Sequence, residues 1–149
     1  MRKALTQTTS TLLMSAMIGA IQLGSAHAAT VKKPNLDEVW ISQFGKIHWR
    51  QGFYNNSNNR ISGQLFQDSK GKWIYSGRWS RANSSRNGHV HFTFSDDGYS
   101  FKGAYTSEDP QRKEWNGLNP LAPTTFGNRD TICVFYNGEQ LCIKTADNP

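Results

Sequence analysis

The stretch that decides the fold spans residues 75–117 and contains the segments YSGRW at 75–79 and FKGAY at 101–105. Each segment has the order aromatic, spacer, glycine, spacer, aromatic. Side chains at positions i, i+2 and i+4 of a strand share one face, so each segment places two rings on one face with a glycine between them. Both segments therefore predict β-strands with an aromatic, inward face.

The stretch between these two segments alternates in the same way. Val90, Phe92 and Phe94 share one face of a predicted strand, and His89 and His91 lie on the opposite face. This alternation is typical of an antiparallel strand with one buried face. We therefore expect the two histidines to lie on the outer face of the sheet.

Outward from this stretch, short apolar segments recur between turn signals. Asp96-Asp97-Gly98 is a strong turn signal, and the polar runs at 55–59 and 82–88 are expected to be loops. No window shows sustained helical periodicity. The chain is therefore predicted to be all-β, an antiparallel meander that forms a small barrel or a strongly coiled sheet, with a C-terminal disulfide-linked hairpin.

The last hairpin can be derived residue by residue. Asn137-Gly138 is the preferred pair for a two-residue type I′ loop, because both positions need a positive φ. With such a loop the flanking residues pair outward from the turn, which places Val134 opposite Leu141 and Cys133 opposite Cys142. Directly opposed cysteines are close enough for a disulfide, and an oxidising compartment would form it.

The N-terminus has the pattern of an export signal. Arg2 and Lys3 form a short basic start, an apolar stretch follows at 12–23, and Ala26-His27-Ala28 fits the small-x-small cleavage rule. The expected division is a signal peptide at 1–28, a flexible lead-in at 29–37 and a single β domain at 38–149.

Cleavage after Ala28 changes the charge of the chain. The signal contains two of the 17 Lys and Arg residues, which leaves 15 against 11 Asp and Glu and a net charge of +4. This charge permits binding to an anionic surface or glycan without demanding it. The expected location is the periplasm or the cell exterior, with no nucleic acid partner and no stable membrane anchor.

Glycines recur between inward aromatic residues at Gly63, Gly77 and Gly103. Glycine weakens a strand unless the position requires it. We therefore expect these to be positions where the sheet bends sharply or a ring crosses the backbone, as in small closed barrels.

The order of the aromatic and glycine motifs also resembles a known architecture. The motifs are Trp40, Phe44-Gly45, Gly-x-Trp at 77–79, Phe-x-Gly-x-Tyr at 101–105 and Trp-x-Gly at 115–117. They resemble the meander of small exported bacterial β-barrels, of which the avidin-like and lipocalin-like barrels are the best known. No set of ligand-contacting residues matches one by one, so the resemblance implies an architecture and no particular ligand.

The leading functional expectation is a non-catalytic binding protein that needs no cofactor. Its partner would be a small ligand in the barrel mouth, or an envelope or extracellular protein bound in the manner of an inhibitor. Rings beside Lys or Arg can stack on sugars or flat ligands, and the candidate binding residues are Trp73, Arg78, Trp79 and Trp115. A pocket with converging polar groups would favour the small ligand. A filled interior with an apolar outer patch would favour the protein partner.

Two alternatives remain open. One is a hydrolase acting on envelope or extracellular glycans, in which Glu114 is the first carboxylate to test, although such chemistry needs a second carboxyl across a cleft. The other is a periplasmic metal-binding protein that uses His48, His89 and His91, which carry the imidazoles that zinc and copper prefer.

Overall fold

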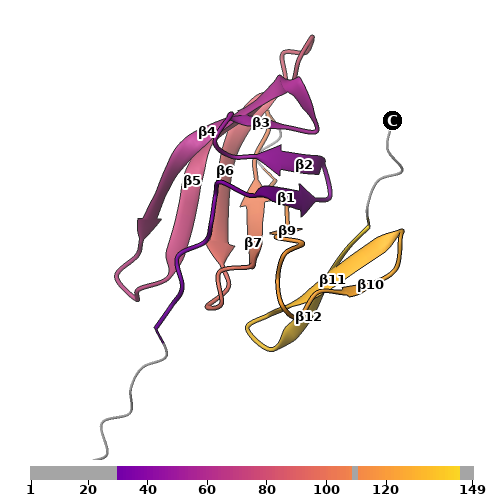
Figure 1. Ribbon diagram of the computed structural model, residues 1–149. Coiled ribbons are helices and arrows are strands. Elements are labelled where there is room, and N and C mark those ends of the chain that lie inside the picture. Colours follow the sequence, from indigo (N-terminus) through magenta and orange to yellow (C-terminus); the bar gives the residue numbers. More distant parts are fainter. Residues whose placement is uncertain (1–29, 109–110, 145–149) are drawn as a thin grey trace, which may run out of the picture.

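The chain forms only β-structure in the part that the computed structural model describes, residues 30–108 and 111–144 (Figure 1). The strands are β1 (Val39–Ser42), β2 (Gly45–His48), β3 (Phe53–Tyr54), β4 (Asn56–Gln67), β5 (Trp73–Ser80), β6 (Asn87–Phe94), β7 (Ser100–Tyr105), β8 (Lys113–Glu114), β9 (Gly117–Leu118), β10 (Phe126–Gly127), β11 (Thr131–Tyr136) and β12 (Glu139–Lys144). Within these residues there is no helix that is long and apolar enough to cross a membrane.

Eight of these strands close an antiparallel barrel, which confirms the all-β prediction and decides between a barrel and an open sheet. The hydrogen-bonded order is β6-β5-β4-β3-β2-β1-β9-β7, and the pairing of β7 with β6 closes the ring. Each strand from β1 to β7 pairs with its neighbour in sequence. The exception is the gap between β1 and β7, which β9 fills.

The segment that closes the barrel is one extended stretch along β7. Ala104 pairs with Glu114 near one end of β7, and Phe101 pairs with Gly117 near the other. Between these pairings, the backbone N–H of Trp115 donates to the Gly103 carbonyl at 3.0 Å. Strands β8 and β9 therefore continue one ladder in the same register.

The barrel interior is filled by aromatic side chains, as the alternating pattern predicts. Trp40, Phe92, Phe94 and Phe101 have no exposed area. The ring centroids of Phe92 and Phe101 lie 4.4 Å apart, and those of Trp40 and Phe94 lie 5.4 Å apart. Such ring pairs contribute about 0.5–1.5 kcal/mol each beyond the burial of their area.

Two of the recurrent glycines allow neighbouring backbones to approach closely. Gly63 pairs with Gly77 across β4 and β5. A Cβ on Gly77 would lie 2.0 Å from the Ser62 carbonyl oxygen and 2.7 Å from the Gly63 Cα. Gly103 meets a ring instead, since its Cβ would lie 2.3 Å from Cδ1 of Phe92. The predicted ring crossing is confirmed at Gly103, whereas the close backbone approach at Gly63 and Gly77 was not predicted.

The C-terminal hairpin has the predicted register. Val134 pairs with Leu141, and Cys133 pairs with Cys142 and forms a disulfide with it. Asn137 in the turn has a φ of 48°, as a type I′ loop requires. The structure adds a third strand, β10, which pairs with β11.

The three-stranded C-terminal sheet packs beside the barrel through a second apolar cluster (Figure 1). The buried members of this cluster are Leu118, Ala122, Val134, Leu141 and Ile143. Leu118 belongs to the barrel strand β9, so this cluster, which is separate from the aromatic core, joins the C-terminal sheet to the barrel.

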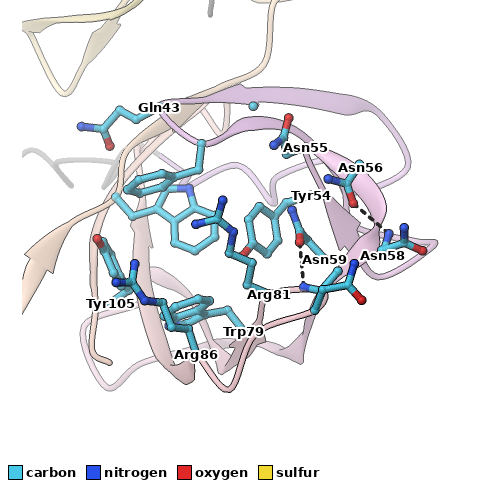
Figure 2. Close-up of a pocket in the computed structure, with 15 residues that line it drawn as sticks. Gln43, Tyr54, Asn55, Asn56, Asn58, Asn59, Trp79, Arg81, Arg86 and Tyr105 are labelled. Atoms are coloured by element: carbon cyan, nitrogen blue, oxygen red, sulfur yellow. Dashed lines mark hydrogen bonds between the residues drawn. The ribbon is translucent and has the colours of Figure 1, made fainter. Parts of the chain in front are cut away.

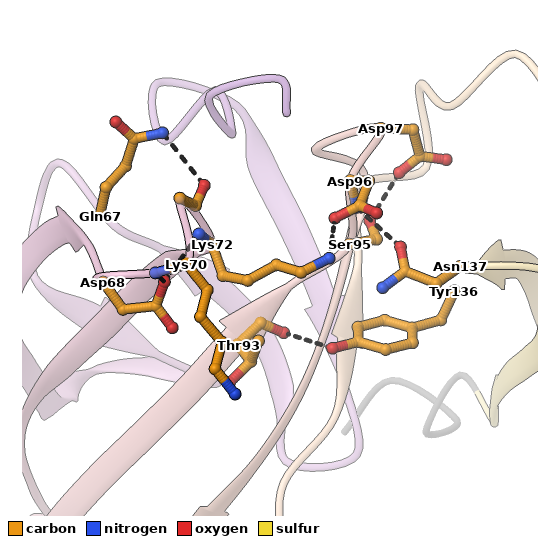
Figure 3. A network of polar contacts seen from close by, with 11 residues as sticks. Gln67, Asp68, Lys70, Lys72, Thr93, Ser95, Asp96, Asp97, Tyr136 and Asn137 are labelled. Carbon is orange, nitrogen blue, oxygen red and sulfur yellow. Dashed lines mark hydrogen bonds and ion pairs between the residues drawn. The ribbon is translucent and has the colours of Figure 1, made fainter. Parts of the chain in front are cut away.

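Polar contacts join the tip of the C-terminal hairpin to the barrel at the end of β6 and the turn that follows it (Figure 3). The Tyr136 hydroxyl donates to the Thr93 carbonyl at 3.2 Å, and burial raises the pKa of Tyr136 above its ordinary value. The Asp96 N–H donates to Oδ1 of Asn137 at 2.8 Å, and the Asp96 carboxylate pairs with Lys72. The hairpin is therefore held by both apolar and polar contacts.

The segment expected to be a flexible lead-in contacts the barrel over its described residues. The N–H of Lys32 donates to the Asp96 carbonyl at 2.8 Å, and Leu36 packs against the aromatic core. The Trp40 indole N–H donates to the Asn35 carbonyl at 2.9 Å. These contacts fasten the described part of the segment before β1 to the barrel. The expected signal peptide lies outside the described residues.

Candidate functional site

Alternate connections of the meander gather at one end of the barrel, which we call the mouth. In an up-and-down arrangement successive connections lie at opposite ends, so the turns β1–β2, β3–β4 and β5–β6 fall together. The mouth pocket is lined by Gln43, Phe44, Gly45, Tyr54, Asn55, Asn56, Asn58, Asn59, Trp79, Arg81, Ala82, Asn83, Arg86, Tyr105 and Trp115 (Figure 2).

The mouth pocket has the size of a small-molecule site. Its volume is about 640 Å³, and ligand pockets are commonly about 300–1,000 Å³. Its lining includes residues from β1–β2, β3–β4, β5–β6 and the end of β7, so the pocket exists only when the barrel is closed.

Aromatic rings form the floor of the mouth pocket. The Trp115 ring lies 5.0 Å from that of Tyr54, 4.9 Å from that of Phe44 and 5.8 Å from that of Tyr105. The Trp79 ring packs 5.6 Å from that of Tyr105. Trp79, Trp115 and Tyr54 are buried and Phe44 is exposed, so the floor continues the barrel core upward into an accessible apolar surface.

Two arginines supply the charge of the mouth pocket. Arg81 and Arg86 both come from the loop between β5 and β6, and this loop is closed by the Arg81 N–H, which donates to the Arg86 carbonyl at 3.0 Å. Both side chains are exposed, and neither is in an ion pair with a described residue. No carboxylate is among the described residues that line this pocket. The site is therefore cationic.

Several asparagine side chains lie together on one side of the mouth pocket, and two of them accept backbone N–H groups (Figure 2). Oδ1 of the buried Asn59 accepts the Ala82 N–H at 3.0 Å, which ties β4 to the arginine loop. Oδ1 of Asn56 accepts the Asn58 N–H at 3.0 Å. With their oxygens committed, both amides have their NH₂ groups available as donors.

Tyr54 adds a neutral hydroxyl to the pocket. Burial raises the pKa of Tyr54, the charge of Arg81 opposes this effect, and Tyr105 adds to it, so that the pKa stays above its ordinary value. The phenol therefore remains protonated at neutral pH. Its hydroxyl lies 3.5 Å from the Ser80 carbonyl, a long separation for a hydrogen bond.

A smaller side pocket adjoins the mouth pocket. Its volume is about 290 Å³, and it shares Trp79, Arg86 and Tyr105 with the larger pocket. The side pocket also contains Glu108 and Lys113, so its charge is mixed. The cationic character of the site thus belongs to the mouth pocket.

The structure brings together two of the four residues that the sequence suggested for ligand binding. Trp79 and Trp115 both line the mouth pocket. Trp73 begins β5, at the end of the strand away from Trp79, and packs against the core there with Lys33 over its ring. Arg78 is exposed on β5 between inward residues and lies outside the pocket lining.

The three histidines suggested as metal ligands do not gather. His48 is the last residue of β2, and its ring stacks on that of Phe53 with the centroids 4.4 Å apart. His89 and His91 are exposed on β6. In the closed ring, β5, β4 and β3 separate β6 from β2 in one direction, and β1, β9 and β7 separate them in the other. Across the described residues no group of three His, Cys, Asp or Glu side chains could hold a metal ion.

Glu114, the carboxylate suggested for hydrolysis, lies beside the site. It is exposed on β8 and accepts a hydrogen bond from Nδ2 of Asn116 at 2.7 Å. It lines neither the mouth pocket nor the side pocket, and Glu108 is the carboxylate that the side pocket contains among the described residues. The described residues that line these two pockets therefore include no pair of carboxyls of the kind that glycoside hydrolysis requires.

Sequence reasoning missed most of the polar lining. The run at 55–59 was expected to be a loop, but β4 begins at Asn56 and carries these amides along the rim. The loop expected at 82–88 contributes Arg86, and Arg81 immediately precedes it. Both runs were visible in the sequence, and counting alternate connections of the predicted meander would have placed them at the same end.

Comparison of this chain with protein families, curated proteins and solved structures finds no match.

Proposed function

We propose that this protein is an exported, non-catalytic binding protein that holds a small ligand in its mouth pocket. The observation that carries the proposal is a pocket of about 640 Å³ in which guanidinium and amide groups from separate strands converge above an aromatic floor. A largely preformed concave site with a few converging polar groups is the usual form of a small-molecule site.

The packing of the barrel supports the mouth as the place where a ligand is held. An eight-stranded barrel is just wide enough to be filled by side chains or to hold one small ligand. Here Phe92, Phe94 and Phe101 are fully buried in the interior of the barrel. The space available to a ligand is therefore above Tyr54 and Trp115, where the strands end.

The lining supports binding rather than catalysis. Arg81 and Arg86 can hold a ligand, but a glycosidase needs a carboxyl pair across the scissile bond. The described lining of the mouth pocket contains no carboxylate. A hydrolase centred on Glu114 would need a second carboxyl near it, and Glu114 lies outside both pockets.

Two features support export as part of the proposal. The disulfide between Cys133 and Cys142 suits an oxidising compartment. The sequence before residue 29 has the pattern of a cleavable signal. Both point to the periplasm or the cell exterior as the place where the ligand is met.

A protein partner is the second candidate, favoured by a pair of exposed rings on the C-terminal sheet. Phe126 is 41% exposed and Phe135 is 43% exposed, and their centroids lie 5.5 Å apart. None of the described pockets is lined by these two rings. We therefore rank this surface second to the mouth pocket as a candidate binding site. Loss of partner capture by Phe135→Ser in a pull-down would support it.

Native mass spectrometry tests the small-ligand proposal. The protein is isolated from its own envelope fraction, and a retained small molecule is expected as a mass shift. Asn58→Trp places a large ring at the exposed rim of the pocket and should abolish this shift. Ser76→Trp, on the exposed outer face of β5, is the matched control and should retain it. Retention by Asn58→Trp as well would refute binding in the mouth.

A further inference from the structure

We infer that the ligand of the mouth pocket is a small organic anion of the acidic-sugar type, with its carboxylate or phosphate between Arg81 and Arg86. The inference rests on the proposed function and names the chemistry of its ligand. It starts from an imbalance in the lining: the described residues of the pocket offer two cations and several free donors, and no anion.

Both arginines line the mouth pocket from the same loop. Arg81 and Arg86 stand at the two ends of one loop, where the Arg81 N–H donates to the Arg86 carbonyl at 3.0 Å. Figure 2 shows Arg81 extending over Tyr54 and Arg86 beside Tyr105. A guanidinium presents a planar fork of donors that matches a carboxylate or a phosphate.

The loop that carries the arginines is held in place before any ligand arrives. Buried Asn59 accepts the Ala82 N–H at 3.0 Å, and the Ser84 hydroxyl accepts the Arg86 N–H at 3.0 Å. Each contact fixes the backbone next to an arginine. A preorganised backbone lowers the ordering cost of binding.

The amides make the rest of the lining rich in donors. The side-chain oxygens of Gln43, Asn56 and Asn59 accept backbone N–H groups at 2.7, 3.0 and 3.0 Å. In these contacts the amides act only as acceptors, so their NH₂ groups remain available to donate to a ligand. The buried indole N–H of Trp115 also has no acceptor among the described residues.

This donor-rich lining selects among small anions. A ligand that satisfies it must offer many acceptor oxygens in addition to its charge, because each unmatched buried donor reduces the affinity. A sugar acid or a sugar phosphate has such oxygens on its ring and hydroxyl groups. Its C–H faces can pack on the rings of Phe44 and Tyr105, which lie 5.3 Å apart at the edge of the floor. The class of ligand that fits best is therefore an acidic saccharide.

Among the described residues, the carboxylate of Glu108 lies in the side pocket and forms no ion pair with the arginines. Glu108 shares that pocket with Lys113 and Arg86, but it is absent from the lining of the mouth pocket. Within the described chain no salt bridge joins Glu108 to Arg86. A ligand anion thus meets two guanidinium groups that are in no ion pair with a described residue.

The experiment uses isothermal titration calorimetry on the intact, disulfide-bonded protein with matched probes. The acidic probes are trigalacturonate and glucose 6-phosphate, and the neutral probes are maltotriose and glucose. Inorganic phosphate and sulfate report the oxyanion alone. Each acidic probe should bind at least about tenfold more tightly than its neutral counterpart, because a charge-assisted hydrogen bond is lost in the neutral probe. The preference should shrink as salt rises.

Three charge-removing variants locate the anion. Arg81→Gln and Arg86→Gln should each weaken the acidic probes by about tenfold. Arg78→Gln removes the same charge from the exposed outer wall of β5 and should leave their affinities unchanged. All three arginines are exposed, so the variants should unfold at the same temperature as the parent, and this is measured first.

Each outcome decides the inference. Tighter binding of trigalacturonate would identify a carboxylate, tighter binding of glucose 6-phosphate a phosphate, and either supports the inference if Arg81 and Arg86 are needed. Equal binding of acidic and neutral probes, indifference to both substitutions, or no binding by any acidic probe would overturn it. If a neutral molecule is retained in native mass spectrometry and lost with Asn58→Trp, the proposed function stands and this inference falls. If no molecule is retained and no probe binds, both fall.

Discussion

Removal of the disulfide offers a test of how the C-terminal hairpin contributes to stability. The perturbation is the double substitution Cys133→Ala and Cys142→Ala. The two cysteines are separated by 9 positions in the sequence and pair directly across β11 and β12. Their bond therefore constrains only the turn region of the unfolded chain.

The magnitude follows from the length of this loop. For a loop of nine residues, the chain-entropy relation gives a stabilisation of about 2.6 kcal/mol at 25 °C. The native hairpin keeps its other supports, since Val134, Leu141 and Ile143 remain buried in the second cluster and Tyr136 still donates to Thr93. We therefore expect a loss of about 2.6 kcal/mol and a fall in Tm of roughly 10 °C, with the fold retained.

The measurement is equilibrium unfolding in urea, followed by tryptophan fluorescence and by far-ultraviolet circular dichroism. Coincident curves from both signals would indicate that the hairpin and barrel unfold together. The m-value should rise slightly, because the unlinked chain exposes more surface when it unfolds. The parent protein with its disulfide reduced is the matched control and should unfold like the double variant.

A particular result would refute this reasoning. If the double variant lost no stability, the hairpin would already be ordered in the unfolded chain. If it lost the whole of its stability, the disulfide would be holding native contacts together rather than restricting the unfolded state. Two separate transitions would show that the second cluster does not couple the C-terminal sheet to the barrel.

Three further predictions concern single side chains. Gly77→Ala should destabilise the protein by about 3 kcal/mol or more in urea unfolding, because its Cβ would lie 2.0 Å from the Ser62 carbonyl oxygen. Burial raises the pKa of Tyr75 to about 12, so stability should be full below pH 10, where the phenol is protonated in both states, and should fall between pH 10 and 12 as only the unfolded chain ionises. Tyr75→Phe should reduce this fall in unfolding curves measured across that range. Asn137→Gly keeps the positive φ of the turn but removes the acceptor of the Asp96 N–H, and should cost about 1 kcal/mol in the same urea assay.

Each of these predictions can fail on its own. A Gly77→Ala variant as stable as the parent would mean that β4 and β5 can separate without cost at Gly63. An identical alkaline fall with and without the Tyr75 hydroxyl would assign the pH dependence to other groups. Unchanged stability of Asn137→Gly would mean that water replaces the lost acceptor at the exposed tip.

The elements of the fold were largely predictable because their signals are local. The faces of β5, β6 and β7 follow from alternation within five to eight residues, as Tyr75, Phe92 and Phe101 illustrate. The register of the last hairpin follows from its two-residue loop. The same signals could not predict the short strands β8, β9 and β10, because a two-residue strand is too short to show an alternating pattern.

The candidate site was predictable only in part. Trp79 and Trp115 were suggested because tryptophans beside charge are conspicuous in a sequence, and both line the mouth pocket. Arg78 was suggested for the same reason but faces outward, because the period of a strand puts it on the face opposite Trp79. Consistent use of that period would have excluded Arg78 and turned attention to Arg81, beyond the end of the strand.

The sequence by itself determined the class of fold, the inward faces of the long strands and the pairing of Cys133 with Cys142, because each of these depends on neighbours within a few residues. Only the tertiary structure decided that the barrel closes through β9 and that Arg81, Arg86 and Asn59 meet around one pocket. The physical reason is that closure depends on the summed packing of rings from every strand, and on glycines that let the backbones approach. No single local pattern contains that sum, and the site at the mouth exists only as its consequence.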